Sequence, residues 1–257
     1  MKFQKDSPRP IVLIRGLLRE QRHWGDFRKQ LCKQYPHRPV ICLDLAGNGA
    51  RFRVDSPSSI RKMVNDLRVQ LRLEEINPYS IDIVAISMGG MIAIEWITCY
   101  PNEVDSAVLI NTSTRPYSPF YQRLNWRQLP TIFKIFHSSP ERKEALILSL
   151  TSNNLHQHQG TLKDWVRWRE QYPVSSRNTL AQLQAAARYR VRYSPTKPVL
   201  LLASEQDQLV NVACSKALAA HWHLPLFLHP NAGHDLPLDE PEWVCEQIEA
   251  FFQQRAL

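Results

Sequence analysis

One serine of the chain, Ser87, lies where its hydroxyl could act as a nucleophile. The apolar run of residues 83–86 leads directly into it, and Gly89 and Gly90 follow shortly afterwards. This pattern predicts a strand that turns sharply into a helix, which strains the serine backbone and exposes its hydroxyl above the sheet edge. Bulky side chains at Ala85, Gly89 or Gly90 would crowd such a turn. The alternative role for Ser87 is to cap the following helix.

A serine nucleophile needs a base, a carboxylate that orients the base, and N–H donors for the oxyanion. We expect His234 as the base and Asp207 as the carboxylate, because each follows a predicted strand at the edge where the loops of a parallel sheet converge. Glu205 lies close to Asp207 in sequence and competes for its role, and Asp207 could instead cap a helix. The alternative for His234 is an ordinary histidine in a surface loop.

The loop that follows the first apolar strand, residues 15–17, is expected to supply one oxyanion donor. Gly16 permits a close backbone approach, so the amide of Leu17 can point at a carbonyl group beside the amide of Met88. Because Met88 opens a helix, the helix dipole also favours an anion there. Arg15 is a candidate for binding a substrate carboxylate or phosphate, although an arginine that packs its stem over the loop is the commoner arrangement.

These residues need a scaffold, and the apolar runs of the chain predict one. Short β-rich runs alternate with longer helical stretches, which is the pattern of an α/β fold with a mostly parallel sheet and helices on both faces. The predicted strands are Ile11–Ile14, Val40–Leu43, Ile81–Ile86, Ala107–Asn111, Val199–Ala203 and Leu226–His229. The predicted helices around them are His23–Tyr35, Ser58–Glu75, Met88–Tyr100, Val212–His221 and Pro241–Gln253.

Residues 115–192 break this alternation and are expected to form a helical cap inserted between two strands. The core domain then comprises residues 1–114 and 193–257. Prolines divide the cap into three or four helices. The candidate helices are Tyr121–Phe136, Glu141–Ser149, Thr161–Tyr172 and Arg177–Tyr189. Trp165 and Trp168 lie three residues apart on one of them and could line an apolar substrate pocket or pack the cap against the core.

The charge of the cap also sets it apart. The chain has a formal net charge of +8, yet residues 115–192 alone carry 13 Lys and Arg against 4 Asp and Glu. Scattered basic residues usually mark solvated surface, but a basic element over an active site would also attract acidic partners. No nucleic-acid-binding module is recognisable, so nucleic acid is not an expected partner.

The composition favours a cytoplasmic globular protein without metal or cofactor. No segment approaches the roughly twenty apolar residues that span a bilayer. The five cysteines are scattered without a C-x-x-C pair, which predicts buried thiols in a reducing compartment. His156 and His158 lie two residues apart and would not share a helix face, so they do not predict a metal site.

Taken together, these motifs resemble those of the α/β-hydrolase fold superfamily. The matching residues are Arg15-Gly16, Asp44-Leu45-Ala46-Gly47-Asn48-Gly49, the turn at Ser87, Asp207 and Gly233-His234. The resemblance covers nearly the whole chain and implies a triad in the order Ser87, Asp207, His234, with a helical cap after the sixth strand. Three positions depart from the family pattern: Arg15 replaces a usual histidine, the turn after Asp44 lacks a proline and a histidine, and Ala85 replaces a common glycine.

The resemblance implies a serine hydrolase that cleaves a carboxylic ester through an acyl-enzyme, on a small-molecule or carrier-bound substrate. The size, triad order and basic cap are similar to the pimeloyl-carrier-protein methyl esterases, whose basic cap receives an acidic acyl carrier protein. Thioester hydrolysis, carbon–carbon bond hydrolysis, perhydrolysis and lyase chemistry share the fold and stay open. A non-catalytic ligand-binding protein, with Arg15 blocking the oxyanion loop, is the alternative from another class.

Overall fold

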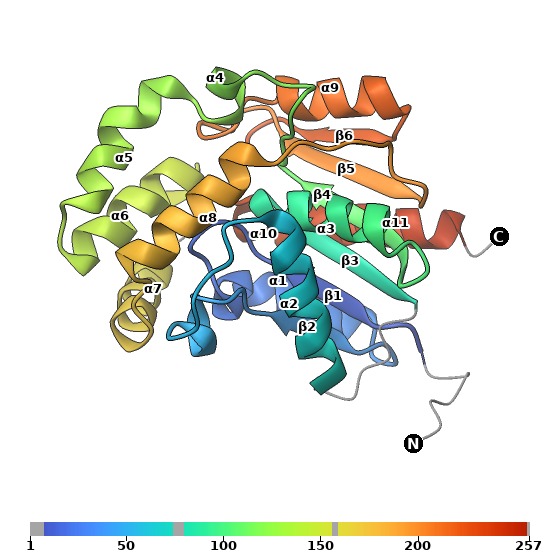
Figure 1. The fold of residues 1–257 in the computed structure, drawn as a ribbon, viewed down its shortest axis with the longest axis horizontal. Coiled ribbons are helices and arrows are strands. Elements are labelled where there is room, and N and C mark those ends of the chain that lie inside the picture. The colour runs from blue at the N-terminus through green and yellow to red at the C-terminus, as the bar shows by residue number, and fades with distance from the viewer. Residues whose placement is uncertain (1–7, 74–79, 156–158, 256–257) are drawn as a thin grey trace.

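The computed structural model describes residues 8–73, 80–155 and 159–255 of the chain (Figure 1). Six parallel strands form one sheet in the order β2-β1-β3-β4-β5-β6. The strands are β1 (Ile11–Ile14), β2 (Val40–Leu43), β3 (Ile81–Ile86), β4 (Val104–Ile110), β5 (Val199–Ser204) and β6 (Leu226–His229). The predicted α/β fold with a parallel sheet is therefore confirmed.

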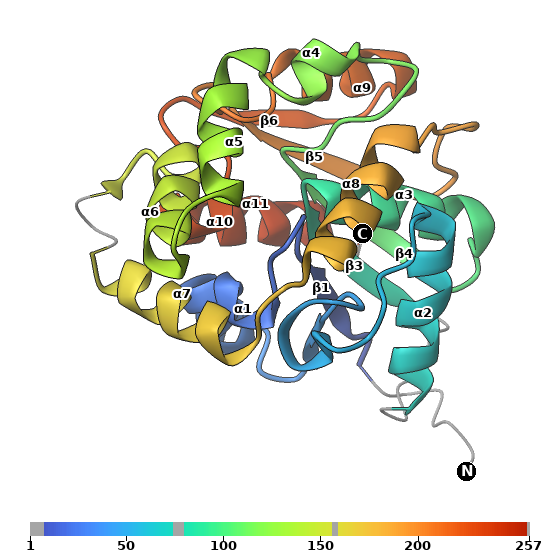
Figure 2. The same ribbon diagram turned by 60° about the vertical axis from the view of Figure 1, so that its left-hand side comes forward.

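Helices cover both faces of this sheet, because successive residues of each strand point to opposite sides. Val12 and Ile14 of β1 pack toward α2, α3 and α9, whereas Ile11 and Leu13 pack toward α1, α10 and α11 (Figures 1 and 2). The core helices are α1 (Gly25–Gln34), α2 (Ile60–Leu73), α3 (Met88–Cys99), α9 (Ala213–Trp222), α10 (Leu236–Asp239) and α11 (Pro241–Gln254), with short 3₁₀ turns η1 (Gln21–Trp24) and η2 (Gly49–Arg51).

All six predicted strands are present, and the largest difference in their bounds is at the start of β4. This strand begins at Val104, which pairs with Ile81, and not at Ala107. The pairing extends because Ser106 donates a hydrogen bond from Oγ to Oδ1 of Asp82 in β3. A polar pair thus continues the strand beyond its apolar run, which hydrophobic periodicity does not reveal.

Between β4 and β5, the described residues of the segment 115–192 form several helices. They are α4 (Phe120–Arg123), η3 (Trp126–Gln128), α5 (Leu129–Phe136), α6 (Pro140–Thr151), α7 (Gln159–Gln171) and α8 (Ser176–Arg188). The single helix predicted over Tyr121–Phe136 is wrong, since the Asn125 amide donates to the Leu209 carbonyl and its side chain caps η3. The segment follows the fourth strand of the described sheet, not a sixth, because this sheet begins at Ile11.

The two ends of the helical segment meet beside the sheet. A backbone bridge joins Arg115 to Arg190, and α5, α6 and α7 lie to one side of the sheet in both ribbon views (Figures 1 and 2). This arrangement supports the proposed division into a core and a cap at residues 115–192.

Two further expectations concern membranes and cysteines. None of the helices within the three described ranges is long and apolar enough to cross a bilayer.

All five cysteines are free thiols, but the prediction that they are buried holds only in part. Cys32 is exposed on the outer face of α1, and Cys42 and Cys99 are half-buried. His156 and His158 lie outside the described residues.

Candidate active site

Ser87 joins β3 to α3 in a sharp turn. Its φ of 57° and ψ of −122° place it in a positive-φ conformation that costs a non-glycine residue about 1–3 kcal/mol. The turn closes because its neighbours are small: a Cβ on Gly89 would lie 2.4 Å from the Ile14 carbonyl oxygen, and one on Gly90 would lie 2.5 Å from Thr112 Oγ1. The Ser87 side chain makes no capping bond to α3. Its hydroxyl is therefore not used for the alternative structural role.

The imidazole of His234 is held by Asp207. Nδ1 of the ring lies 2.7 Å from Oδ2 of Asp207, and both side chains are buried. The other oxygen, Oδ1, accepts hydrogen bonds from the Leu209 and Val210 amides at 2.8 and 2.9 Å. The carboxylate contact assigns the ring hydrogen to Nδ1 and leaves Nε2 as the basic nitrogen. Glu205, the competitor in sequence, is exposed on the same turn.

Asn111 fixes the loops that carry this pair, and sequence analysis did not single it out as a site residue. It follows β4 with a φ of 46°, and its Nδ2 donates to the His234 carbonyl at 2.8 Å. Its Oδ1 accepts from the Ser204 amide at 2.8 Å. The end of β4 therefore ties the end of β5 to the histidine loop. An asparagine at a strand end with a positive φ is a turn signal, but its partners are not readable from sequence.

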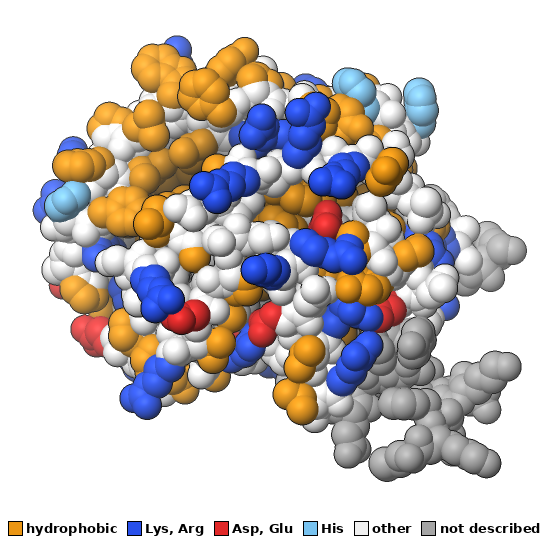
Figure 3. All heavy atoms as spheres, in the orientation of Figure 1, with side chains coloured by type: hydrophobic (Ala, Val, Ile, Leu, Met, Phe, Trp, Pro, Cys, Tyr) orange, Lys and Arg blue, Asp and Glu red, His pale blue; other side chains and the backbone are white. Residues whose placement is uncertain are grey.

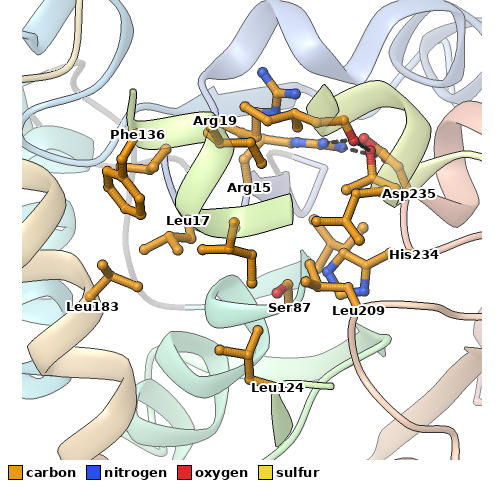
Figure 4. A pocket seen from close by; sticks show the side chains of 18 residues that line it. Arg15, Leu17, Arg19, Ser87, Leu124, Phe136, Leu183, Leu209, His234 and Asp235 are labelled. Atoms are coloured by element: carbon orange, nitrogen blue, oxygen red, sulfur yellow. Dashed lines mark hydrogen bonds and ion pairs between the residues drawn. The ribbon is translucent and has the colours of Figure 1, made fainter. Parts of the chain in front are cut away.

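Ser87 and His234 line the same cavity, which has a volume of about 180 Å³ (Figure 4). Most of its wall is apolar and comes from the loop after β1, the ends of core elements and the cap. The apolar lining residues are Leu17, Leu18, Ile86, Leu124, Ile132, Ile135, Phe136, Ile147, Leu150, Leu183 and Leu209. Among the described residues, no hydrogen bond joins Ser87 Oγ to the His234 ring.

The loop after β1 passes directly beside the serine. A Cβ on Gly16 would lie 3.0 Å from Cβ and 3.4 Å from Oγ of Ser87, so only glycine fits there without displacement. Within the described residues, neither the Leu17 amide nor the Met88 amide donates to another protein group. The role of these two N–H groups as oxyanion donors stays a prediction.

A buried glutamine of the cap, Gln182 on α8, supports this loop. Leu18 has a φ of 58°, and its amide donates to Gln182 Oε1 at 3.1 Å. The Nε2 of the same glutamine donates to Asn48 Oδ1 at 2.8 Å. Gln182 has only one signal in the sequence, which is that it lies four residues after Asn178 on one helical face. Both of these polar side chains are buried, whereas a polar helical face is normally solvated.

Arg15 lines the cavity, but its guanidinium group is paired with Asp235. Its Nη1 and Nη2 donate to Oδ1 and Oδ2 of Asp235 at 3.0 and 2.5 Å, and both side chains are buried. The guanidinium lies 4.8 Å from the centre of the Trp24 ring. Figure 4 shows it directed at Asp235 and away from Ser87. This geometry matches the packing alternative and does not favour a substrate-anion role, because Asp235 compensates the charge.

Neither Trp165 nor Trp168 lines the cavity beside Ser87. Both pack edge-on against His23, with ring centres 5.3 Å apart in each case. The structure places these tryptophans away from Ser87 and agrees with the packing alternative. The face of α7 that carries them is turned toward η1, so they pack the cap against the core.

A buried ionic cluster also joins the loop after β1 to the cap, and it was missed in sequence analysis. Glu144 of α6 accepts from Arg19 Nη1 at 2.6 Å and from Arg169 Nε. Burial alone would raise the pKa of Glu144, but these two arginines hold it below its usual value. Burial lowers the pKa of the adjacent His23 well below its usual value, and the charges of Arg19 and Arg15 add to this effect.

Curated proteins similar to this chain include acyl-transfer and biosynthetic enzymes. The ethanol acetyltransferase 1 of Eremothecium cymbalariae is 22% identical, and the alignment covers 98% of this chain and 76% of that protein. The biotin biosynthesis bifunctional protein of Teredinibacter turnerae is 23% identical over 99% of this chain. The alignment covers 47% of that bifunctional protein, so this chain spans about half of its length.

Among solved structures, a thermophilic esterase from Thermogutta terrifontis has the same fold. The TM-score is 0.77 at 19% identity, with 96% of this chain and 90% of that chain covered. The model of the alpha/beta hydrolase family matches residues 11–247, a range that contains all six strands, Ser87, Asp207 and His234. The chain therefore belongs to the alpha/beta hydrolase family.

Proposed function

We propose that this protein is a serine hydrolase that cleaves a carboxylic ester through an acyl-enzyme intermediate. One observation carries the proposal. Ser87, held in a strained turn, and His234, held by Asp207 at 2.7 Å, line one apolar cavity together. The similarity to an esterase structure supports an ester as the bond that is cleaved.

In the first half of the reaction, Nε2 of His234 takes the proton of Ser87 Oγ as this oxygen attacks the ester carbonyl carbon. The Leu17 and Met88 amides donate to the oxyanion that forms. His234 returns the proton to the leaving alkoxide when the carbon–oxygen bond breaks. A water molecule then repeats these steps, which releases the acid and frees Ser87. Since Ser87 and His234 are not hydrogen bonded in the described structure, this contact forms when substrate is bound.

The cavity wall indicates the kind of acyl group. It is formed mainly by leucine and isoleucine side chains, and the charge of Arg15 at its edge is neutralised by Asp235. An uncharged, apolar acyl chain fits this environment better than a charged one. A graded series of p-nitrophenyl esters should therefore show the highest kcat/KM for an apolar chain that fills the cavity.

The test of the proposed function is the Ser87→Ala variant together with a fluorophosphonate probe. We expect the probe to label the wild-type protein on Ser87, and the variant to lose activity by about 10⁴-fold or more, because triad residues act as a unit. Near-normal turnover by folded Ser87→Ala would disprove the mechanism. Absence of labelling on folded wild-type protein would instead favour the non-catalytic ligand-binding alternative.

A carrier-bound methyl ester is the more specific substrate that we propose. The net charge of the cap and the similarity to a biotin biosynthesis protein support it. Arg188, the last residue of α8, and Arg190 and Arg192 just after this helix are exposed and form no ion pair within the described part of the chain. If they receive an acidic carrier, activity on the carrier-bound ester should fall steeply with added salt. Flat salt dependence would remove this candidate.

Assays with other substrates distinguish ester hydrolysis from the other reactions that the same triad could catalyse. A thioester, a carbon–carbon substrate and an alcohol acceptor should each be assayed beside the oxygen ester. The alcohol acceptor is included because a similar protein is an ethanol acetyltransferase. Ester turnover that exceeds each of these supports the proposal, whereas faster transfer to an alcohol than to water would make the protein an acyltransferase.

A further inference from the structure

The cap presents an unusual apolar surface to solvent between Phe120 and Phe136. The side chain of Phe120 is 78% exposed and that of Phe133 is 66% exposed. The other exposed large apolar residues of this segment are Tyr121, Leu124, Trp126, Leu129 and Phe136. We call these seven residues the lid surface. Helix α5 buries none of its residues, and Figure 3 shows the apolar side chains gathered over the region of α4 and α5.

The exposed large apolar side chains of the described chain are concentrated in residues 120–136. Of the 14 large apolar residues that are exposed in the described chain, seven lie within residues 120–136. Exposed leucines and phenylalanines scattered over a protein need no explanation, but a contiguous group marks a binding surface. The lid surface therefore has the character of a binding surface.

The charge around the lid surface identifies the kind of occupant. Residues 115–140 contain three arginines and Lys134 but no aspartate or glutamate. Arg127 and Lys134 are exposed and form no ion pair with the rest of the described chain. Aromatic and aliphatic side chains mixed with cations are typical of segments that lie in an anionic lipid–water interface, with apolar groups in the acyl region and cations at the headgroups.

A second copy of the chain fits this surface less well. In a two-fold dimer, the lid surface of one copy would face the lid surface of the other copy. Arg127 and Lys134 of one copy would therefore approach the same cations of the other, without any acidic residue of the segment to compensate. An anionic lipid surface supplies both the apolar cover and the opposite charge.

The lid surface also continues into the catalytic cavity. Leu124 and Phe136 are both exposed to solvent and line the cavity. On the inner side of α5, Ile132 and Ile135 belong to the cavity wall. An apolar molecule that enters at this lip would therefore move toward Ser87 without losing contact with apolar side chains.

We infer that the lid surface binds an anionic lipid–water interface and admits an apolar ester from that interface to the cavity. The second half of this inference rests on the proposed function, and the first half does not. A lipid surface thus adds a source of substrate that differs from the carrier protein considered above. The carrier would use Arg188, Arg190 and Arg192, so the two surfaces can be changed separately.

Vesicle binding by the full chain tests the inference. Wild-type protein should co-sediment with vesicles of phosphatidylcholine and phosphatidylglycerol much more than with phosphatidylcholine alone. The Phe120→Ser/Phe133→Ser variant and the Arg127→Gln/Lys134→Gln variant should each reduce this binding at least about tenfold, since both apolar contact and charge contribute. These four residues do not line the cavity. Activity on a water-soluble p-nitrophenyl ester should therefore stay within about twofold of wild type.

The matched control is Val69→Ser/Leu180→Ser, which removes two exposed apolar side chains outside the lid surface. It should bind vesicles like wild type. Wild-type protein that stays in solution with anionic vesicles would overturn the inference, and so would equal losses in the control and the lid variants. If the phenylalanine variant instead converted a dimer to a monomer, the occupant would be a second copy. If the protein bound vesicles but had no esterase activity, the lipid-binding role of the lid surface would stand and the proposed function would be wrong.

Discussion

Arg15 and Asp235 form a buried, two-bond ion pair between the two loops that flank Ser87. Arg15 immediately precedes Gly16 of the oxyanion loop, and Asp235 immediately follows His234. In the proposed mechanism, the pair would therefore fix the spacing between the two N–H donors and the base. Because its guanidinium is directed at Asp235, Arg15 does not extend toward Ser87 (Figure 4).

The first prediction concerns this pair. Arg15→Met should lower the free energy of unfolding by about 3–5 kcal/mol, because it leaves the Asp235 carboxylate buried without a counter-charge. The double variant Arg15→Met/Asp235→Leu should recover a substantial part of this loss. Urea unfolding of the wild type, both single variants and the double variant gives the coupling energy. Additive effects of the two substitutions would show that the pair does not stabilise the site.

The second prediction separates Asp207 from its neighbour in sequence. Asp207→Asn should lower kcat by about 10⁴-fold, because an amide no longer stabilises the protonated ring and favours the wrong tautomer of His234. Glu205→Gln is the matched control and should leave kcat unchanged, since Glu205 is exposed and does not contact the ring. Comparable losses in the two variants would contradict the assignment of Asp207 as the orienting carboxylate.

The third prediction tests the oxyanion loop. Gly16→Ala should reduce kcat with little change in global stability, because the new methyl group presses on Cβ of Ser87 and on the Ile86 carbonyl oxygen at 3.3 Å. A displaced Leu17 amide costs about 10²–10³-fold in kcat when one oxyanion donor is lost. Gly160→Ala is a control because a Cβ there meets nothing within 4 Å. Full activity in Gly16→Ala would place the oxyanion donors elsewhere.

The sheet, and the positions of Ser87, Asp207 and His234 after its strands, could be predicted because their signals are local. Consecutive apolar residues indicate a strand, and parallel strands bring the loops that follow them to one edge of the sheet. The small residues around Ser87 indicate the tight turn, because larger side chains would not fit there. These inferences need no knowledge of which distant segments are in contact.

The remaining features depend on contacts between segments far apart in sequence. Arg15 and Asp235 are 220 residues apart, and nothing near either residue indicates its partner. Gln182 supports the oxyanion loop only because its face of α8 turns inward. The same limit applies to the tryptophans of α7, because their spacing predicts a shared helix face but not what that face contacts.

The last prediction concerns pH and the ionic cluster behind the oxyanion loop. His23 is buried between Trp165 and Trp168, and its Nε2 lies 3.1 Å from Nη1 of Arg19. Burial, with the charges of Arg19 and Arg15, lowers the folded-state pKa of this imidazole well below the ordinary value of 6.5. Below about pH 6.5 the unfolded chain therefore gains a proton that the folded chain does not.

Stability should accordingly fall as the pH drops below 6.5, by at most about 1.4 kcal/mol per pH unit from this one group. His23→Gln cannot titrate, and its amide oxygen can still accept from Arg19, so its unfolding free energy should change less between pH 7.5 and 5.5. The depressed pKa of Glu144 acts at lower pH, below its ordinary value of 4.5. Burial raises the pKa of the neighbouring Glu20 and Asp44 carboxyl groups, which stabilises the folded protein as the pH falls, so the comparison with His23→Gln isolates the contribution of the histidine. His37→Gln, at an exposed site, should retain the wild-type pH dependence. Parallel curves for wild type and His23→Gln in urea unfolding would show that His23 is protonated without cost in the folded protein.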